Sequence, residues 1–181
     1  TALSYRRVSE GETDLLYIIP LEGNISGGTA DFILRALAEA QQRQAEGIIL
    51  VLKTFGGFAD SMTEIGDAIS KSKVPVDVFV EGRAISAGAY IALCGNRLVI
   101  SPDGVLGASQ PLVADGTPAP EKTKAAFRKM FRAVAEARAK RRGVDLDPLI
   151  AEAMVDPEVE VEGVVTKGEL LALTAKEALT H

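Results

Sequence analysis

Short apolar segments alternate with segments of helical periodicity along this chain, and this alternation restricts the fold more than any other sequence feature. The segments, in order, are strand 14–23, helix 24–46, strand 47–54, helix 58–73 and strand 74–82. Short strands that are buried on both faces and separated by helices pair in parallel. We therefore expect an α/β fold with a parallel sheet, flanking helices and a ligand site at the carboxyl ends of the strands, where Thr54 and Gly82 end theirs.

The remaining sequence continues the pattern less regularly. The predicted elements are an apolar helix over 86–96, a strand over 97–102, short strands and a loop over 101–121, a long helix over 122–142, a short helix from Asp147, strands over 158–163 and 169–174, and a helix after Thr174. We find no domain boundary, so we expect residues 1–181 to form a single domain. A first residue that is not Met, and a helical pattern at the last residues, predict a fragment of a longer protein.

Composition narrows the class of protein. With 181 residues, 47% apolar content and 25% charged content, the chain is typical of a soluble globular domain. A net charge of −5 argues against nucleic acid as the main partner. The single cysteine, Cys94, excludes an internal disulfide and a metal site of several thiolates, and we expect no metal or cofactor. No apolar run approaches the roughly 20 residues that cross a bilayer.

One segment departs from the acidic balance. Residues 122–142 hold nine Lys or Arg against one acid, Glu136. Such a helix is compatible with an anionic membrane surface or with nucleic acid. A solvated helix face, or an interface with an acidic partner, is the interpretation that we favour.

Two motifs follow predicted strands, where a site is expected. In TFGGFADSM, Gly56 and Gly57 permit positive φ angles and leave backbone amides accessible to a ligand. In AISAGAY, Ser86 is either a helix cap or a nucleophile, and the amide of Ala87 lies in the first turn of the next helix. The amides of Gly57 and Ala87 could together stabilise the oxyanion formed when a serine attacks an amide.

A nucleophilic serine needs a base, and lysine is the candidate. The only histidine, His181, is the last residue, which makes a Ser-His-Asp triad improbable. A lysine with an ordinary pKa of about 10.4 is neutral in roughly one molecule in 2,500 at pH 7, so burial and a helix N-terminus must lower that pKa. Lys122 follows PAPE at the start of the long helix and is the best candidate, with Lys124 next. We expect Lys53 to be buried in a strand.

The other lysines considered are expected to face solvent. They are Lys71, Lys73, Lys124 and Lys129.

The segments TFGGFADSM, AISAGAYIALCGNRLVISPDGVLGAS and LTAKEAL resemble the Clp/crotonase-fold serine peptidases, and among them the membrane-bound NfeD-type proteases, or stomatin-operon partner proteins. The resemblance extends from about residue 16 to residue 179. It implies repeated β-β-α units, Ser86 as nucleophile and Lys122, 36 residues later, as general base. It also places the oxyanion donors at Gly57 and Ala87. The sequence departs from the family at Phe55, where Pro usually precedes the glycine pair.

The resemblance also implies a biological setting. Family members carry this domain outside the cytoplasm, ahead of transmembrane segments, cut hydrophobic segments such as that of a stomatin-like protein, and form dimers. Gly56, Phe58 and Gly88 are the residues expected to contact the substrate. The apolar residues expected around the cleft, Phe55, Phe58, Leu112 and Val113, favour apolar side chains in that substrate.

Two other classes of function stay open. A crotonase-type acyl-CoA enzyme shares the paired-amide oxyanion hole, but it needs an acidic residue near the glycine pair, where only Asp60 and Glu64 are close in sequence. A domain without activity could bind peptides or organise an assembly. Cys94 is expected to be a small buried apolar residue rather than a reactive thiol.

Overall fold

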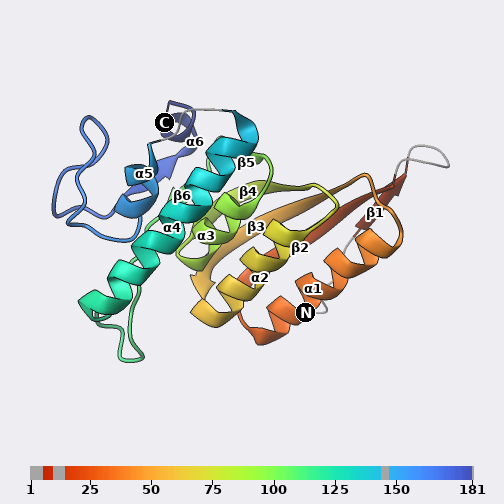
Figure 1. Cartoon of the computed structure of the whole chain (residues 1–181), viewed down its shortest axis with the longest axis horizontal. Helices are drawn as coiled ribbons and strands as arrows, with labels where there is room; N and C mark the ends of the chain where they lie inside the picture. Colours follow the sequence, from red (N-terminus) through yellow and green to blue (C-terminus); the bar gives the residue numbers. More distant parts are fainter. Residues whose placement is uncertain (1–5, 10–14, 144–146, 181) are drawn as a thin grey trace.

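The computed structural model describes residues 6–9, 15–143 and 147–180 (Figure 1). The strands are β1 (Arg6–Ser9), β2 (Leu15–Ile25), β3 (Gly47–Gly57), β4 (Val76–Ile85), β5 (Leu98–Ile100), β6 (Val105–Gly107) and β7 (Ala172–Thr174). The helices are α1 (Gly27–Gln42), α2 (Ala59–Lys71), α3 (Ala87–Cys94), α4 (Glu121–Arg142), α5 (Pro148–Ala153) and α6 (Ala175–Ala178). His181, the only histidine of the sequence, lies outside the described residues.

The described strands form one sheet in the order β1-β2-β3-β4-β6-β7, with β5 also beside β4. The pairs of β2 with β3, β3 with β4, and β4 with both β5 and β6 are parallel, and only the edge pairs are antiparallel. The first half of β4 pairs with β5 and its second half pairs with β6. The α/β class, the largely parallel sheet and the flanking helices are therefore confirmed.

Helices α1, α2 and α4 lie on the same side of the sheet, and α3 lies between the sheet and α4 (Figure 1). Alternate strand residues face these helices, as in β2, where Tyr17, Ile19 and Leu21 are fully buried. The packed core therefore lies between the sheet and the helices.

Helix α3 is the centre of this core, because all eight of its residues are buried. Such a helix is apolar on every face, which is typical of a buried helix. Two glycines permit its close packing. A Cβ on Gly88 would lie 2.5 Å from Thr54 Cγ2, and a Cβ on Gly66 of α2 would lie 2.7 Å from the ring of Tyr90. On the other side, the Tyr90 ring packs against Phe131 of α4, with 5.3 Å between centroids.

The structure corrects the predicted strand ends. β3 continues through the glycine pair to Gly57, and β4 continues through Gly82 to Ile85, so the site lies three residues beyond both predicted ends. The glycines stay in the strand because they pair with Asn24 and Ile25 of β2 after a register shift. The predicted strand over 158–163 is wrong, because only an isolated bridge between residues 161 and 165 occurs there. The predicted helices after Asp147 and Thr174 are confirmed.

Replacing Phe131 by Ala should destabilise the fold strongly. Its ring is fully buried between α3 and α4, so Phe131→Ala leaves a cavity and should lower the free energy of unfolding by about 3 to 5 kcal/mol. Leu179→Ala is the control, since Leu179 is 90% exposed, and should change it by less than about 0.5 kcal/mol. Urea denaturation measures both, and equal stability of the two variants would contradict this packing.

Candidate active site

Ser86 stands at the sharp turn between β4 and α3, in a backbone conformation that is unusual for a residue with a side chain. Its φ is 56° and its ψ is −123°. Its N–H donates to the Gly107 carbonyl at 3.0 Å, which fixes the turn. In the described structure, its hydroxyl makes no capping bond to α3. Ser86 therefore takes the N-cap position of α3 without a side-chain cap bond. A strained strand-to-helix turn that presents a serine hydroxyl is an arrangement in which nucleophilic serines occur, and the catalytic role of Ser86 stays a prediction.

Gly56 lies directly against Ser86. A Cβ on Gly56 would lie 2.7 Å from Ser86 Cβ and 3.1 Å from Ser86 Oγ, and its φ of 111° also favours glycine. Gly57 is equally confined, because a Cβ there would lie 2.0 Å from the Ile25 carbonyl oxygen. No other residue type lets the end of β3 pass between β2 and Ser86.

Beside Ser86 lies an open cavity of about 530 Å³. Residues from β3, α2, the Ser86 turn, the loop after β6 and α4 line it: Gly57, Phe58, Ala59, Asp60, Met62, Ser86, Ala87, Ser109, Gln110, Pro111, Leu112, Val113, Ala114, Phe127 and Phe131. The structure thus brings together four of the predicted site residues, Gly57, Phe58, Ser86 and Ala87. The end of a strand, the first residue of a helix and a serine thus line one cavity, an arrangement compatible with attack on a carbonyl.

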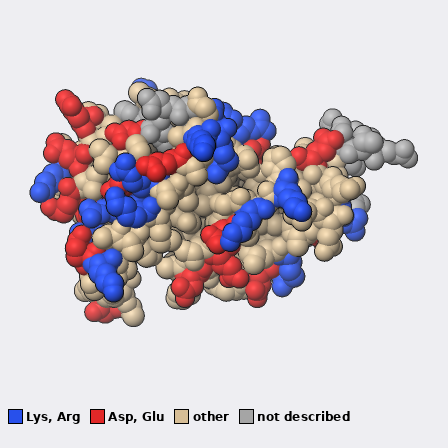
Figure 2. Space-filling model, viewed as in Figure 1, with Lys and Arg blue, Asp and Glu red and all other residues tan. Residues whose placement is uncertain are grey.

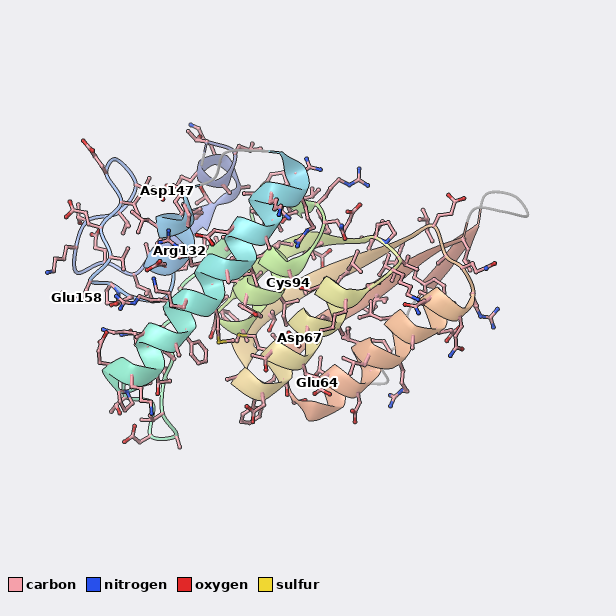
Figure 3. The ribbon with its side chains drawn as sticks, in the orientation of Figure 1. Glu64, Asp67, Cys94, Arg132, Asp147 and Glu158 are labelled. Carbon is pink, nitrogen blue, oxygen red and sulfur yellow. The ribbon has the colours of Figure 1, made fainter. Side chains whose placement is uncertain are left out.

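The rim of this cavity, the Ser86 cavity, is apolar. Phe58 is 65% exposed, Leu112 is 58% exposed and Val113 is 40% exposed. Large apolar side chains in contact with water beside a cavity are typical of a binding site for apolar ligands. Of the two acids considered for acyl-CoA chemistry, Asp60 lines the Ser86 cavity and Glu64 does not; Figure 3 shows Glu64 on α2.

Two predicted contact residues take other positions. Gly88 is buried against Thr54 within α3 and does not line the Ser86 cavity. Gly56 lines a second cavity, and a Cβ added to Gly56 would point at Ser86. Their contact with substrate stays a prediction, and the structure shows a packing requirement for both.

Lys122 is the second residue of α4, directly after the first-turn residue Glu121, as the sequence predicts. The predicted burial is wrong, because Lys122 is exposed. It does not line the Ser86 cavity, and within the described residues it forms no hydrogen bond or ion pair. The structure therefore places Lys122 at the helix terminus, as predicted, but does not bury it.

Lys124, the alternative base, is held in an ion-pair cluster. Its side chain is 16% exposed, and Nζ lies 2.8 Å from Glu121 and 3.1 Å from the buried carboxylate of Asp156. Hydrogen bonds to Glu121 and Asp156 raise the pKa of Lys124 above its usual value, so the amine stays protonated. The prediction that Lys124 faces solvent is wrong, and its bonding makes it a poor base.

Lys53 differs from its prediction too. It is exposed rather than buried, and it pairs with Glu81 at 3.5 Å. The strand alternation explains this, since Leu52 and Thr54 take the inward positions on either side of it. The predicted exposure of Lys71, Lys73 and Lys129 is confirmed.

Sequence reasoning missed two buried hydroxyl residues. Ser109, 3% exposed, donates from Oγ to the Ser86 carbonyl at 3.2 Å, and its N–H donates to the Met154 carbonyl at 2.6 Å. Thr54, 1% exposed, donates to the Gly23 carbonyl at 2.6 Å and accepts the Gly56 N–H at 2.9 Å. A polar residue at an inward strand position is the signal that could have identified Thr54.

Most of the basic side chains on α4 form ion pairs or hydrogen bonds with other groups of the chain. Arg128 pairs with Asp156, Arg132 pairs with Glu152, and Arg138 and Arg141 donate to carbonyls at the end of α3. Figure 3 shows Arg132 beside α5, and on the face in Figure 2 basic and acidic groups are interleaved around α4 and α5. This pairing favours a structural role for the basic helix over contact with an anionic surface.

Cys94 is buried at the end of α3 (Figure 3). Burial raises the pKa of its thiol to about 12, so it is an inert apolar residue at neutral pH. Within the described part of the chain, no group of three or more His, Cys, Asp or Glu side chains could hold a metal ion. No helix in the described ranges is long and apolar enough to cross a membrane.

A strained serine at a strand-to-helix turn, a glycine packed against it and a largely parallel sheet are features of the Clp/crotonase-like class of α/β proteins, to which this fold belongs. The model of the NfeD1b N-terminal domain family matches residues 15–181, and the chain belongs to this family. It is 36% identical over 172 residues to the membrane protein NfeD1b of Bacillus subtilis (strain 168), covering 94% of this chain and 38% of that protein. The chain thus spans well under half of that relative's length.

A second relative and two solved structures are proteases by name. The membrane-bound protease PH1510 of Pyrococcus horikoshii is 37% identical over 103 residues, which is 55% of this chain and 23% of that protein. A membrane-bound stomatin-specific protease with a serine replaced by alanine superposes with a TM-score of 0.76 and 30% identity, covering 93% of this chain and 77% of that one. Its lysine-to-alanine variant, solved with a substrate peptide, gives a TM-score of 0.76 and 30% identity, covering 92% and 72%.

The contact between Gly56 and Ser86 predicts that Gly56→Ala costs more stability than backbone strain alone. Gly82 is the matched control, because its φ is also positive, 75°, but no atom lies within 4 Å of an added Cβ. Gly82→Ala should lower the free energy of unfolding by about 1 kcal/mol, and Gly56→Ala should lower it by about 2 kcal/mol or more. Urea denaturation compares the two, and an equal loss would show that the close approach has no cost.

The cluster around Asp156 predicts a pH-dependent stability. Burial acts to raise the pKa of Asp156, but the Glu158 amide, Lys124 and Arg128 together hold it below its usual value. A carboxylate whose pKa is lowered by folding stabilises the fold at pH values above its unfolded pKa of about 3.9. This stabilisation is lost as the pH falls through the folded pKa. Asp156→Asn should therefore lose about 3 kcal/mol at pH 7, and its deficit should shrink below about pH 4. Urea unfolding curves at pH 7 and at a pH below about 4 test this prediction. A stability deficit that is the same at the two pH values would contradict it.

Proposed function

We propose that this chain is a single serine endopeptidase domain in which Ser86 is the nucleophile and Lys122 the general base. The observation that carries the proposal is the strained turn at Ser86, with Gly56 against its side chain and a largely apolar cavity beside it. The replaced serine and lysine in the related protease structures support a reaction that depends on both residue types.

The proposed reaction transfers an acyl group in two steps. Ser86 Oγ attacks the carbonyl carbon of a peptide bond, and its proton passes to the neutral amine of Lys122. The amides of Gly57 and Ala87 bind the oxyanion, the C–N bond breaks, and the leaving nitrogen takes the proton from the Lys122 ammonium. Water then attacks the acyl-enzyme in the same way and releases Ser86.

Lys122 must come close to Ser86 to act as its base. Its side chain is exposed and does not line the Ser86 cavity. The loop after β6 lines the Ser86 cavity and then leads to the start of α4, where Lys122 lies. We infer that a bound polypeptide brings the Lys122 amine to Ser86 Oγ and excludes water from the pair.

The apolar rim favours a substrate with large apolar side chains. By analogy with the protease named stomatin-specific, we propose a hydrophobic segment of a stomatin-like membrane protein as the substrate, and a dimer of this domain as the working unit. We propose that the domain lies outside the cytoplasm in a membrane-anchored protein, since relatives are named as membrane proteins. Neither a cofactor nor nucleic acid takes part in the proposed reaction.

The dyad predicts loss of cleavage on removal of either residue. Ser86→Ala and Lys122→Ala should each reduce hydrolysis of a denatured apolar polypeptide by at least about 1,000-fold, and wild-type cleavage should rise between about pH 6 and pH 10 as the base deprotonates. Lys140→Ala is the control, because Lys140 is exposed on the same helix. Mass spectrometry of the products measures the rates and the bonds cut.

Other outcomes identify other functions. Full activity of Lys122→Ala with loss in Lys124→Ala would move the base to Lys124. Peptide binding without turnover, and no reaction of Ser86 with a fluorophosphonate, would identify a binding module. Binding of a CoA thioester that is lost in Asp60→Asn would favour the acyl-CoA enzyme.

A further inference from the structure

Phe55 is the most exposed aromatic side chain in the described part of the chain, at 72%, although it lies within β3 directly before the glycine pair. Its neighbour Thr54 is 1% exposed and faces the core. Because strand residues alternate between faces, Phe55 points away from α3, on the other side of β3 from the packed core. A large apolar ring in water beside the candidate nucleophile is a feature that folding alone does not require.

The ring is held in place. The guanidinium carbon of Arg83 lies 4.4 Å from the ring centroid of Phe55, which is the geometry of a cation–π contact. Arg83 comes from β4, so the contact joins two neighbouring strands near their carboxyl ends. One face of the ring is thereby occupied, and the rest of the ring is a fixed apolar platform for a ligand.

A second cavity of about 530 Å³ surrounds this platform. It is lined by Glu22, Gly23, Asn24, Lys53, Phe55, Gly56, Gly57 and Arg83. Gly57 lines this cavity and the Ser86 cavity as well, so the two hollows meet at the proposed oxyanion donor. A chain whose carbonyl reaches Gly57 therefore lies between them.

An extended polypeptide places successive side chains on opposite sides. If one side chain enters the Ser86 cavity, the side chain of an adjacent residue points toward the cavity of Phe55. We propose that Phe55 and Arg83 form a second substrate subsite, which takes a large apolar and preferably aromatic side chain from a residue adjacent to the one bound in the Ser86 cavity. This inference rests on the proposed function and names a specificity determinant for it.

The charges at this subsite favour a neutral side chain. Lys53 is paired with Glu81 at 3.5 Å, and Glu22 offsets the charge of Arg83 within the same cavity. The Arg83 guanidinium is stacked on the ring, where it can extend a stack with a bound aromatic group. The ring supplies the contact area, and Arg83 fixes its orientation.

The first test measures binding, so that it does not depend on turnover. In the Ser86→Ala chain, affinities are measured by fluorescence anisotropy for apolar peptides that carry Phe or Ala at each position around the cleaved bond. At one adjacent position, Phe should bind about tenfold tighter than Ala, and adding Phe55→Ala should abolish that difference. Phe55→Tyr should retain it, Arg83→Gln should reduce it, and Val99→Ala, 54% exposed on β5, should leave it unchanged.

The second test measures cleavage. In the chain with Ser86 intact, Phe55→Ala should lower kcat/KM about tenfold more for the Phe peptide than for the Ala peptide, a selective loss that general destabilisation does not produce. An unchanged preference in Phe55→Ala, or a preference for acidic residues that depends on Arg83, would overturn the subsite. Phe55-dependent binding without any wild-type cleavage would support the subsite and refute the proposed protease.

Discussion

The strained backbone of Ser86 is the constraint on which the arrangement of this domain depends. A residue with positive φ persists only where its surroundings hold it there. Here the Gly107 carbonyl accepts the Ser86 N–H, the Ser109 hydroxyl donates to the Ser86 carbonyl, and Gly56 leaves no room for the turn to relax. These contacts come from β6, the loop after it and β3, so the position of the hydroxyl requires the sheet to be complete.

The C-terminal part of the chain supports the Ser86 turn through Ser109. Met154 accepts the Ser109 N–H, and two residues later Asp156 anchors Lys124 and Arg128 of α4. The segment 154–156 therefore links the serine turn to the start of the helix that carries Lys122. The basic composition of α4 follows from this task, because buried carboxylates need cationic partners. The basic residues that suggested a membrane or nucleic acid as partner are mostly paired with groups of the domain itself.

The glycine pair separates two hollows of different character. On one side, Ser86 and the amide of Ala87 adjoin a cavity with an apolar floor formed by Met62 and Phe131. On the other, Phe55 forms an exposed platform under Arg83. A polypeptide with large apolar residues at neighbouring positions matches both, and such segments are buried or membrane-embedded in folded proteins. Relatives of the chain are named as a membrane protein and as a membrane-bound protease, one of them stomatin-specific.

The sequence by itself determined the α/β class and the order of most elements, and it predicted four residues that line one cavity, Gly57, Phe58, Ser86 and Ala87. Apolar periodicity identifies α2 and α4, and small residues around Ser86 identify a place of close backbone approach, because both signals are local. Only the tertiary structure decided which lysine is free and which is paired, since Lys124 and Asp156 are distant in sequence. It also revealed the support from Ser109, and it placed Phe55 in a second cavity. These features arise from contacts between elements, and no local pattern records which distant groups meet.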